Sequence, residues 1–125
     1  MYMFAHDNLF HLACNAWCVW LYFGMDSKRA LKTLPVVWLV AVLATFGNET
    51  EVITTGFSGC ICALNGMNLG RKMDIIGAAV FAGIIYIPSL ITDGINNHVH
   101  MCSLIYGFLI ALVGSIYQRF RQYIR

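Results

Sequence analysis

The sequence predicts an all-α polytopic membrane protein with five transmembrane helices, an external N-terminus and a cytoplasmic C-terminus. Two observations predict this fold class. Of the 125 residues, 59% are hydrophobic and 11% are charged, and the mean hydropathy is +0.69, which is too apolar for an ordinary soluble domain. In addition, all 8 basic residues fall in connections on one side of the apolar segments, as the positive-inside rule describes.

The apolar segments are expected to be helices of a single domain over residues 1–125. Lipid offers backbone polar groups no partner, and the segments lack the alternation of a barrel strand. The second and third are shorter than the roughly 20 residues that cross the hydrocarbon core, which is compatible with a central position, a tilt or locally thinned lipid. The five segments are residues 8–24, 34–46, 57–69, 75–91 and 99–117.

The connections between these segments predict the orientation. The basic residues follow the first, third and fifth segments: Lys28, Arg29, Lys32, Arg71, Lys72, Arg119, Arg121 and Arg125. The opposite side receives acidic residues and histidines: Asp7, Glu49, Glu51, Asp93, His6 and His98. This asymmetry places the N-terminus outside. Because the basic residues are dispersed over three connections, they indicate topology rather than a nucleic-acid surface, and no nucleic-acid partner is expected.

The five cysteines all lie inside apolar segments: Cys14, Cys18, Cys60, Cys62 and Cys102. A free cysteine packs as a small apolar residue, and the CxxC spacing of zinc sites is missing. The cysteines are therefore expected to be structural, and they predict neither a disulfide nor a metal site.

Polar residues gather in one outer layer of the predicted bundle. Ser58 lies at the outer end of the third segment, and His100 opens the fifth from the same side. His6, His11 and Asn15 occupy the first turns of the first segment. Polar residues inside a membrane are costly and tend to mark functional sites, so this layer is the candidate site.

Stripes of small residues predict close contact between the third and fifth segments, because such stripes let helix backbones approach. The stripes are Gly59, Ala63, Gly66 and Gly70, and Ser103, Gly107, Ala111 and Gly114. Ser58 and His100 could then come within hydrogen-bond reach, and a neutral imidazole can take a serine proton during attack on a carbonyl. His11 and Asn15, at i and i+4 on one helical face, could donate hydrogen bonds to the resulting oxyanion.

Each of these residues also has a structural interpretation. A Gly-x-Ser-Gly motif can occur by chance, and a transmembrane serine usually donates a hydrogen bond to its own i−4 carbonyl. Taken alone, Asn15 is most simply explained as a residue that hydrogen-bonds to a neighbouring helix. The joint arrangement favours catalysis. The segments contain no lysine for a Ser/Lys protease, no HExxH zinc motif and no paired acidic residues at mid-membrane for an aspartyl mechanism.

Three motifs in these positions are similar to those of the rhomboid intramembrane serine proteases. AHDNLFHLACNAW resembles the family's second helix, GFSG resembles the Gly-x-Ser-Gly of its fourth, and HMCSLIYG resembles the His-x-x-Gly-x-x-x-Gly of its sixth. The order and spacing of the motifs agree with the family from His6 to about Tyr117. The resemblance implies a rhomboid-like bundle.

The resemblance also implies roles for individual residues. Ser58 would be the nucleophile and His100 the base, and the oxyanion hole would consist of His11, Asn15 and the backbone N–H of Ser58. His6 would support the site. Gly56 and Gly59, which have no side chains, would leave room around Ser58, and Gly107 would allow the last helix to pack closely against the helix of Ser58. The implied activity is endopeptidase cleavage of single-pass membrane proteins within the lipid bilayer, without metal or nucleotide cofactors.

Departures from the family pattern keep two other readings open. The chain is expected to be short at its N-terminus, lacking the family's first helix and the loop after it. Cys62 stands where an aromatic residue usually stacks on the catalytic histidine, and Ser103 replaces a glycine. A catalytically inactive rhomboid-like protein, or an inactive fragment of one, that binds transmembrane helices is one alternative. A small transporter or metal-binding bundle is another, using His6, His11, His98 and His100. A prokaryotic plasma membrane is expected from size alone.

Overall fold

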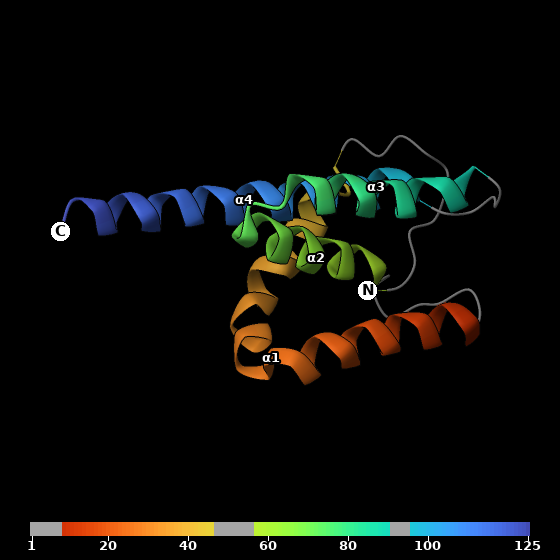
Figure 1. The fold of residues 1–125 in the computed structure, drawn as a ribbon. Helices are drawn as coiled ribbons and strands as arrows, with labels where there is room; N and C mark the ends of the chain where they lie inside the picture. The colour runs from red at the N-terminus through yellow and green to blue at the C-terminus, as the bar shows by residue number, and fades with distance from the viewer. Residues whose placement is uncertain (1–8, 47–56, 91–95) are drawn as a thin grey trace.

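The computed structural model describes residues 9–46, 57–90 and 96–125, which form an all-helical arrangement (Figure 1). No strand occurs among these residues. The helices are α1 (Leu9–Leu43), α2 (Ser58–Lys72), α3 (Ile75–Ser89) and α4 (Asn97–Tyr123). Of the helices in these ranges, α4 is the one that is both long and apolar enough to cross a membrane, and Leu31–Leu43 and Ile75–Ile87 are shorter apolar stretches.

Helix α1 corrects the first part of the sequence interpretation. Residues 8–24 and 34–46 were expected to be two helices joined by a basic loop, but α1 runs without interruption through Lys28 and Lys32. The connecting residues MDSKRALKT contain no glycine or proline and are mostly good helix formers. The helix turns a corner about halfway along its length (Figure 1). Pro35 lies inside α1, and a proline lacks the N–H that bonds the i−4 carbonyl, so it bends a helix locally.

Helices α2 and α4 lie parallel and in direct backbone contact. A Cβ added to Gly66 would overlap the carbonyl oxygen of Leu104, and one added to Gly107 would overlap that of Ala63. Gly70 meets the carbonyl of Phe108 in the same way. Side chains larger than hydrogen are therefore excluded at these positions. The contact aligns the beginnings of the two helices, where the candidate site lies.

The buried core joins the second half of α1 to this helix pair. Val37 and Val40 of α1 and Leu64 of α2 are almost completely inaccessible to solvent. The core contains these residues together with Ala41, Cys60, Ala63, Met67 and Ala111. Cys60 and Cys62 are buried, and Cys102 is partly buried. The side chains of Cys14 and Cys18 lie outside the described part of the structure.

A tight turn joins α2 to α3 and reverses the chain. Met73 adopts a left-handed conformation with φ of 57°, and its N–H bonds the carbonyl of Gly70, as is common just past a helix end. Asp74 then caps α3, because its Oδ1 accepts the N–H of Gly77 at 2.7 Å. After this turn, α3 runs in the direction opposite to α2 and packs mainly against α4 (Figure 1).

Candidate active site

The beginnings of α2 and α4 bring Ser58 and His100 together. Ser58 is the first residue of α2, and His100 lies in the first turn of α4. Ser58 Oγ lies 2.6 Å from His100 Nε2, which is within the range of a hydrogen bond. Both side chains are half-buried. This contact joins residues 42 positions apart in the sequence, and it can form because α2 and α4 are parallel and in close contact.

Gly59 leaves room for α4 beside the serine. A Cβ at this position would lie 3.3 Å from Val99 Cγ1 and 3.5 Å from Ser103 Oγ. It would also lie 3.8 Å from the Cβ of Ala41 on α1. Three helices therefore converge on the residue that follows Ser58, and a methyl group here would require the Val99 side chain to shift by a few tenths of an ångström. Gly56, the other glycine beside Ser58, lies outside the described residues.

Asn96 caps α4 and sets the position of His100, and the sequence interpretation missed this residue. Its side-chain oxygen accepts the N–H of Val99 at 3.2 Å, and only 6% of its surface is exposed. The helix consequently begins at Asn97, before the expected start at Val99. Asparagine directly before an apolar helical run is a common N-cap, so the signal was present in the sequence.

The start of α2 supplies candidate donors for an oxyanion. The first N–H groups of an α-helix have no acceptor within the helix and lie at the positive end of its dipole, and the N–H of Ser58 is one of them. Asn15 is buried on the first half of α1, with 7% of its surface exposed. The side chain of His11 and the whole of His6 lie outside the described residues. The oxyanion role of His11, Asn15 and the Ser58 N–H therefore stays a prediction.

The two small-residue stripes differ in how far they pack. Gly59, Ala63, Gly66 and Gly70 are all buried on α2. On α4, Ser103, Gly107 and Ala111 are buried, but a Cβ on Gly114 would meet no atom of the described residues within 4 Å. The expectation that Gly114 belongs to the packed stripe is therefore wrong. The physical reason is that α2 ends at Lys72, so little of α2 is left beside this turn of α4.

Ser103 is completely buried, and among the residues that the structure describes its hydroxyl has no hydrogen-bond partner. A buried hydroxyl without a partner costs about 1–3 kcal/mol of desolvation. Ser103→Ala is therefore expected to raise the stability of the folded protein by about 1 kcal/mol, measured as a higher midpoint of thermal unfolding in detergent. Ser115→Ala is the matched control, because Ser115 Oγ donates to the Arg71 carbonyl at 3.4 Å. A fall in stability for Ser103→Ala at least as large as that of the control would contradict this expectation.

The two histidines of α4 have different partners. His100 contacts Ser58, whereas His98 Nε2 lies 3.7 Å from the Sγ of Cys102, one turn along the same helix. In the part of the chain that the structure describes, no group of three His, Cys, Asp or Glu side chains could hold a metal ion. His6 and the side chain of His11, which the metal-binding alternative also uses, lie outside the described residues, so that alternative stays a prediction.

Comparisons with known proteins identify the family. The family model of the Rhomboid domain matches residues 1–117. A protein of Acanthamoeba polyphaga mimivirus, described as a "putative rhomboid protein", is 26% identical over 118 residues, which cover 85% of this chain and 68% of the viral protein. No solved structure matches the chain. The viral relative gives no support to the expected prokaryotic plasma membrane. Because the family model covers nearly the whole sequence, this membrane-embedded chain belongs to the rhomboid family.

Proposed function

We propose that this rhomboid-family chain is an intramembrane serine endopeptidase in which Ser58 is the nucleophile and His100 the general base. The observation that supports this proposal most directly is the 2.6 Å distance between Ser58 Oγ and His100 Nε2. A nucleophile and a base in hydrogen-bond contact are the basic requirement for covalent catalysis by serine. The family match supports the proposed reaction class, and the contact supports the choice of the two groups that would carry it out.

The proposed reaction begins when His100 Nε2 accepts the proton of Ser58 as Oγ attacks a peptide carbonyl. The leaving amine then takes that proton from His100, and an acyl group remains on Ser58. Water, deprotonated by the same imidazole, hydrolyses the acyl group and regenerates the free hydroxyl. Each half-reaction is balanced, because the proton that His100 accepts is the proton that it returns.

The oxyanion of each tetrahedral intermediate would form beside the N-terminus of α2. The Ser58 N–H and the side chains of Asn15 and His11 are the proposed donors, and removing one such donor typically costs about a hundredfold or more in rate. The buried position of Asn15 on α1 supports this part of the proposal, because hydrogen bonds are stronger in a dry environment. The proposed substrates are single-pass membrane proteins cut within the bilayer.

A fluorophosphonate probe tests the proposal without knowledge of the natural substrate. An activated serine displaces fluoride from the probe, so a P–O bond to Ser58 Oγ forms, the P–F bond breaks and the serine proton passes to His100. We expect the purified wild type to be labelled on Ser58, and His100→Ala to be labelled at least roughly a hundredfold more slowly. Mass spectrometry of the labelled peptide locates the modified residue. Equal labelling of the wild type and His100→Ala would overturn the proposed pair.

A non-catalytic member of the family is the second candidate function. Cys62 favours it, because this buried residue stands where the resemblance implies an aromatic ring against the catalytic histidine. Such a protein would bind transmembrane helices without cutting them. Absence of labelling in a folded wild type, together with retention of a transmembrane peptide in detergent, would favour this candidate over the protease.

A further inference from the structure

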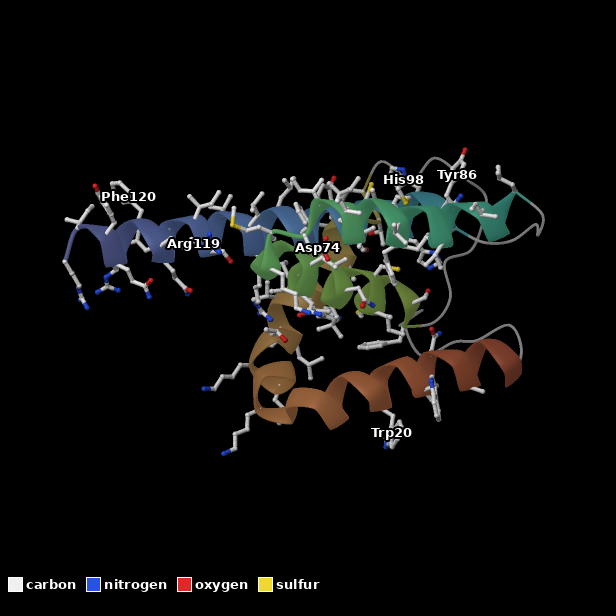
Figure 2. All side chains as sticks on the ribbon, viewed as in Figure 1. Trp20, Asp74, Tyr86, His98, Arg119 and Phe120 are labelled. Atoms are coloured by element: carbon white, nitrogen blue, oxygen red, sulfur yellow. The ribbon has the colours of Figure 1, made fainter. Side chains whose placement is uncertain are left out.

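The C-terminal part of α4 extends past the other helices. Figure 1 shows α4 continuing beyond the ends of α2 and α3, and Figure 2 shows Arg119 and Phe120 on this extension. The 27 residues of α4 span about 40 Å at 1.5 Å per residue, compared with about 30 Å for the hydrocarbon core and 40–45 Å with the headgroup layers. A helix of this length reaches from one headgroup layer into the other.

The extension, defined as residues 116–125, comprises the last turns of α4 and the two residues that follow it, and it separates its apolar and polar side chains onto two faces. At about 100° per residue, its aliphatic and aromatic residues occupy one arc of roughly 120°. They are highly exposed: Ile116, Tyr117, Phe120, Tyr123 and Ile124. The remaining arc carries all the polar side chains: Gln118, Arg119, Arg121, Gln122 and Arg125. Such a division is typical of helices at a membrane interface, where aromatic rings lie at headgroup depth.

The charge on this extension has one sign. Arg119, Arg121 and Arg125 are exposed, and the chain from Asn96 to Arg125 contains no aspartate or glutamate. The α2 end adds Arg71 and Lys72 close by, because Ser115 of α4 bonds the Arg71 carbonyl at 3.4 Å. A basic cluster beside the hydrocarbon attracts anionic lipid, by an amount that corresponds to about fivefold in affinity per arginine or lysine.

We propose that the residues 116–125 extension is a docking surface for the headgroups of anionic phospholipids. The apolar face lies against the acyl chains at the edge of the hydrocarbon, and the three arginines bind lipid phosphates from the polar face. Arginine suits this role because its planar guanidinium binds phosphate oxygens in pairs. Charge complementarity identifies the occupant, and the length of α4 places the surface at headgroup depth. This proposal is independent of protease activity.

Native mass spectrometry of the detergent-solubilised full chain tests the surface. Phosphatidylglycerol is the anionic probe, and phosphatidylcholine, which is zwitterionic, is the neutral one. We expect the wild type to retain phosphatidylglycerol in preference to phosphatidylcholine. The triple variant Arg119→Gln, Arg121→Gln, Arg125→Gln should reduce retention of phosphatidylglycerol by roughly a hundredfold, because each arginine contributes about fivefold. Added salt should reduce retention in the wild type.

A charge-matched control separates a local surface from the effect of net charge. The variant Lys28→Gln, Arg29→Gln, Lys32→Gln removes three positive charges from α1, the same number as in the α4 variant. It should keep the preference for phosphatidylglycerol over phosphatidylcholine. Equal losses in both triple variants, or no loss in the α4 variant, would overturn the proposal. Because the substituted α4 residues are exposed, an unchanged helical circular dichroism spectrum is expected in the α4 variant and is recorded with each measurement.

Discussion

Ser58→Ala is expected to abolish cleavage of a fluorogenic transmembrane substrate in proteoliposomes, with a fall of at least roughly a thousandfold in rate. The substitution removes the oxygen that would form the acyl bond and leaves His100 without the hydroxyl that lies 2.6 Å away. Other groups of the site could still bind substrate, but no acyl intermediate could form. The measurement is the rate of fluorescence increase at matched protein and lipid concentrations.

Ser115→Ala is the matched control for this experiment. Ser115 lies on α4 and bonds the Arg71 carbonyl, at the end of the helix pair away from Ser58, so cleavage should stay within about twofold of the wild type. His100→Ala should lose activity to the same extent as Ser58→Ala, because residues that act as a unit are not additive. Persistent cleavage in both the Ser58 and His100 variants would exclude the proposed mechanism and implicate a contaminating protease.

Gly107→Ala is expected to destabilise the fold by about 3 kcal/mol, at the upper end of the usual cost of overpacking. The added methyl group would overlap the Ala63 carbonyl oxygen, and a backbone oxygen cannot move aside without displacing α2. Helices α2 and α4 would have to separate, and the Ser58 to His100 contact depends on that pairing. The measurement is the midpoint of thermal unfolding in mild detergent, with the rate of fluorophosphonate labelling as a second readout.

Gly114→Ala is the matched control, because the same substitution is made on the same helix in open space. Alanine is a better helix former than glycine by about 1 kcal/mol, so this variant should be as stable as the wild type or slightly more stable. Its labelling should not change. Equal unfolding midpoints for Gly107→Ala and Gly114→Ala would show that α2 and α4 do not pack as closely as the structure has them.

The contact between α2 and α4 connects the stability of the bundle to its proposed chemistry. Gly66, Gly70 and Gly107 admit backbone atoms of the opposite helix, and Gly59 admits the side chains of Val99 and Ser103. The same parallel pairing brings Ser58 to His100. Packing between α2 and α4 therefore helps to hold the His100 imidazole against Ser58, and substitutions along this interface are expected to affect stability and catalysis together.

Much of this molecule could be predicted from local features of the sequence. Composition indicated an all-helical membrane class, and three motifs indicated the rhomboid family, which the family model confirms. The glycines of α2 predicted a closely packed helix, because small side chains at helical spacing have few other uses. These features depend on single segments and on their order along the chain. The orientation in the membrane and the count of five spanning helices stay predictions.

The tertiary structure decided which of these local features meet. Sequence spacing treated Gly107 and Gly114 alike, but only Gly107 lies opposite α2, since α2 ends at Lys72. The basic residues after residue 24 suggested a loop, but this stretch consists mostly of good helix formers, and α1 continues without a break from Leu9 to Leu43. The Ser58 to His100 contact links positions 42 residues apart, and no local pattern determines such a distance. It follows from the axial register of α2 and α4, which packing between whole helices sets.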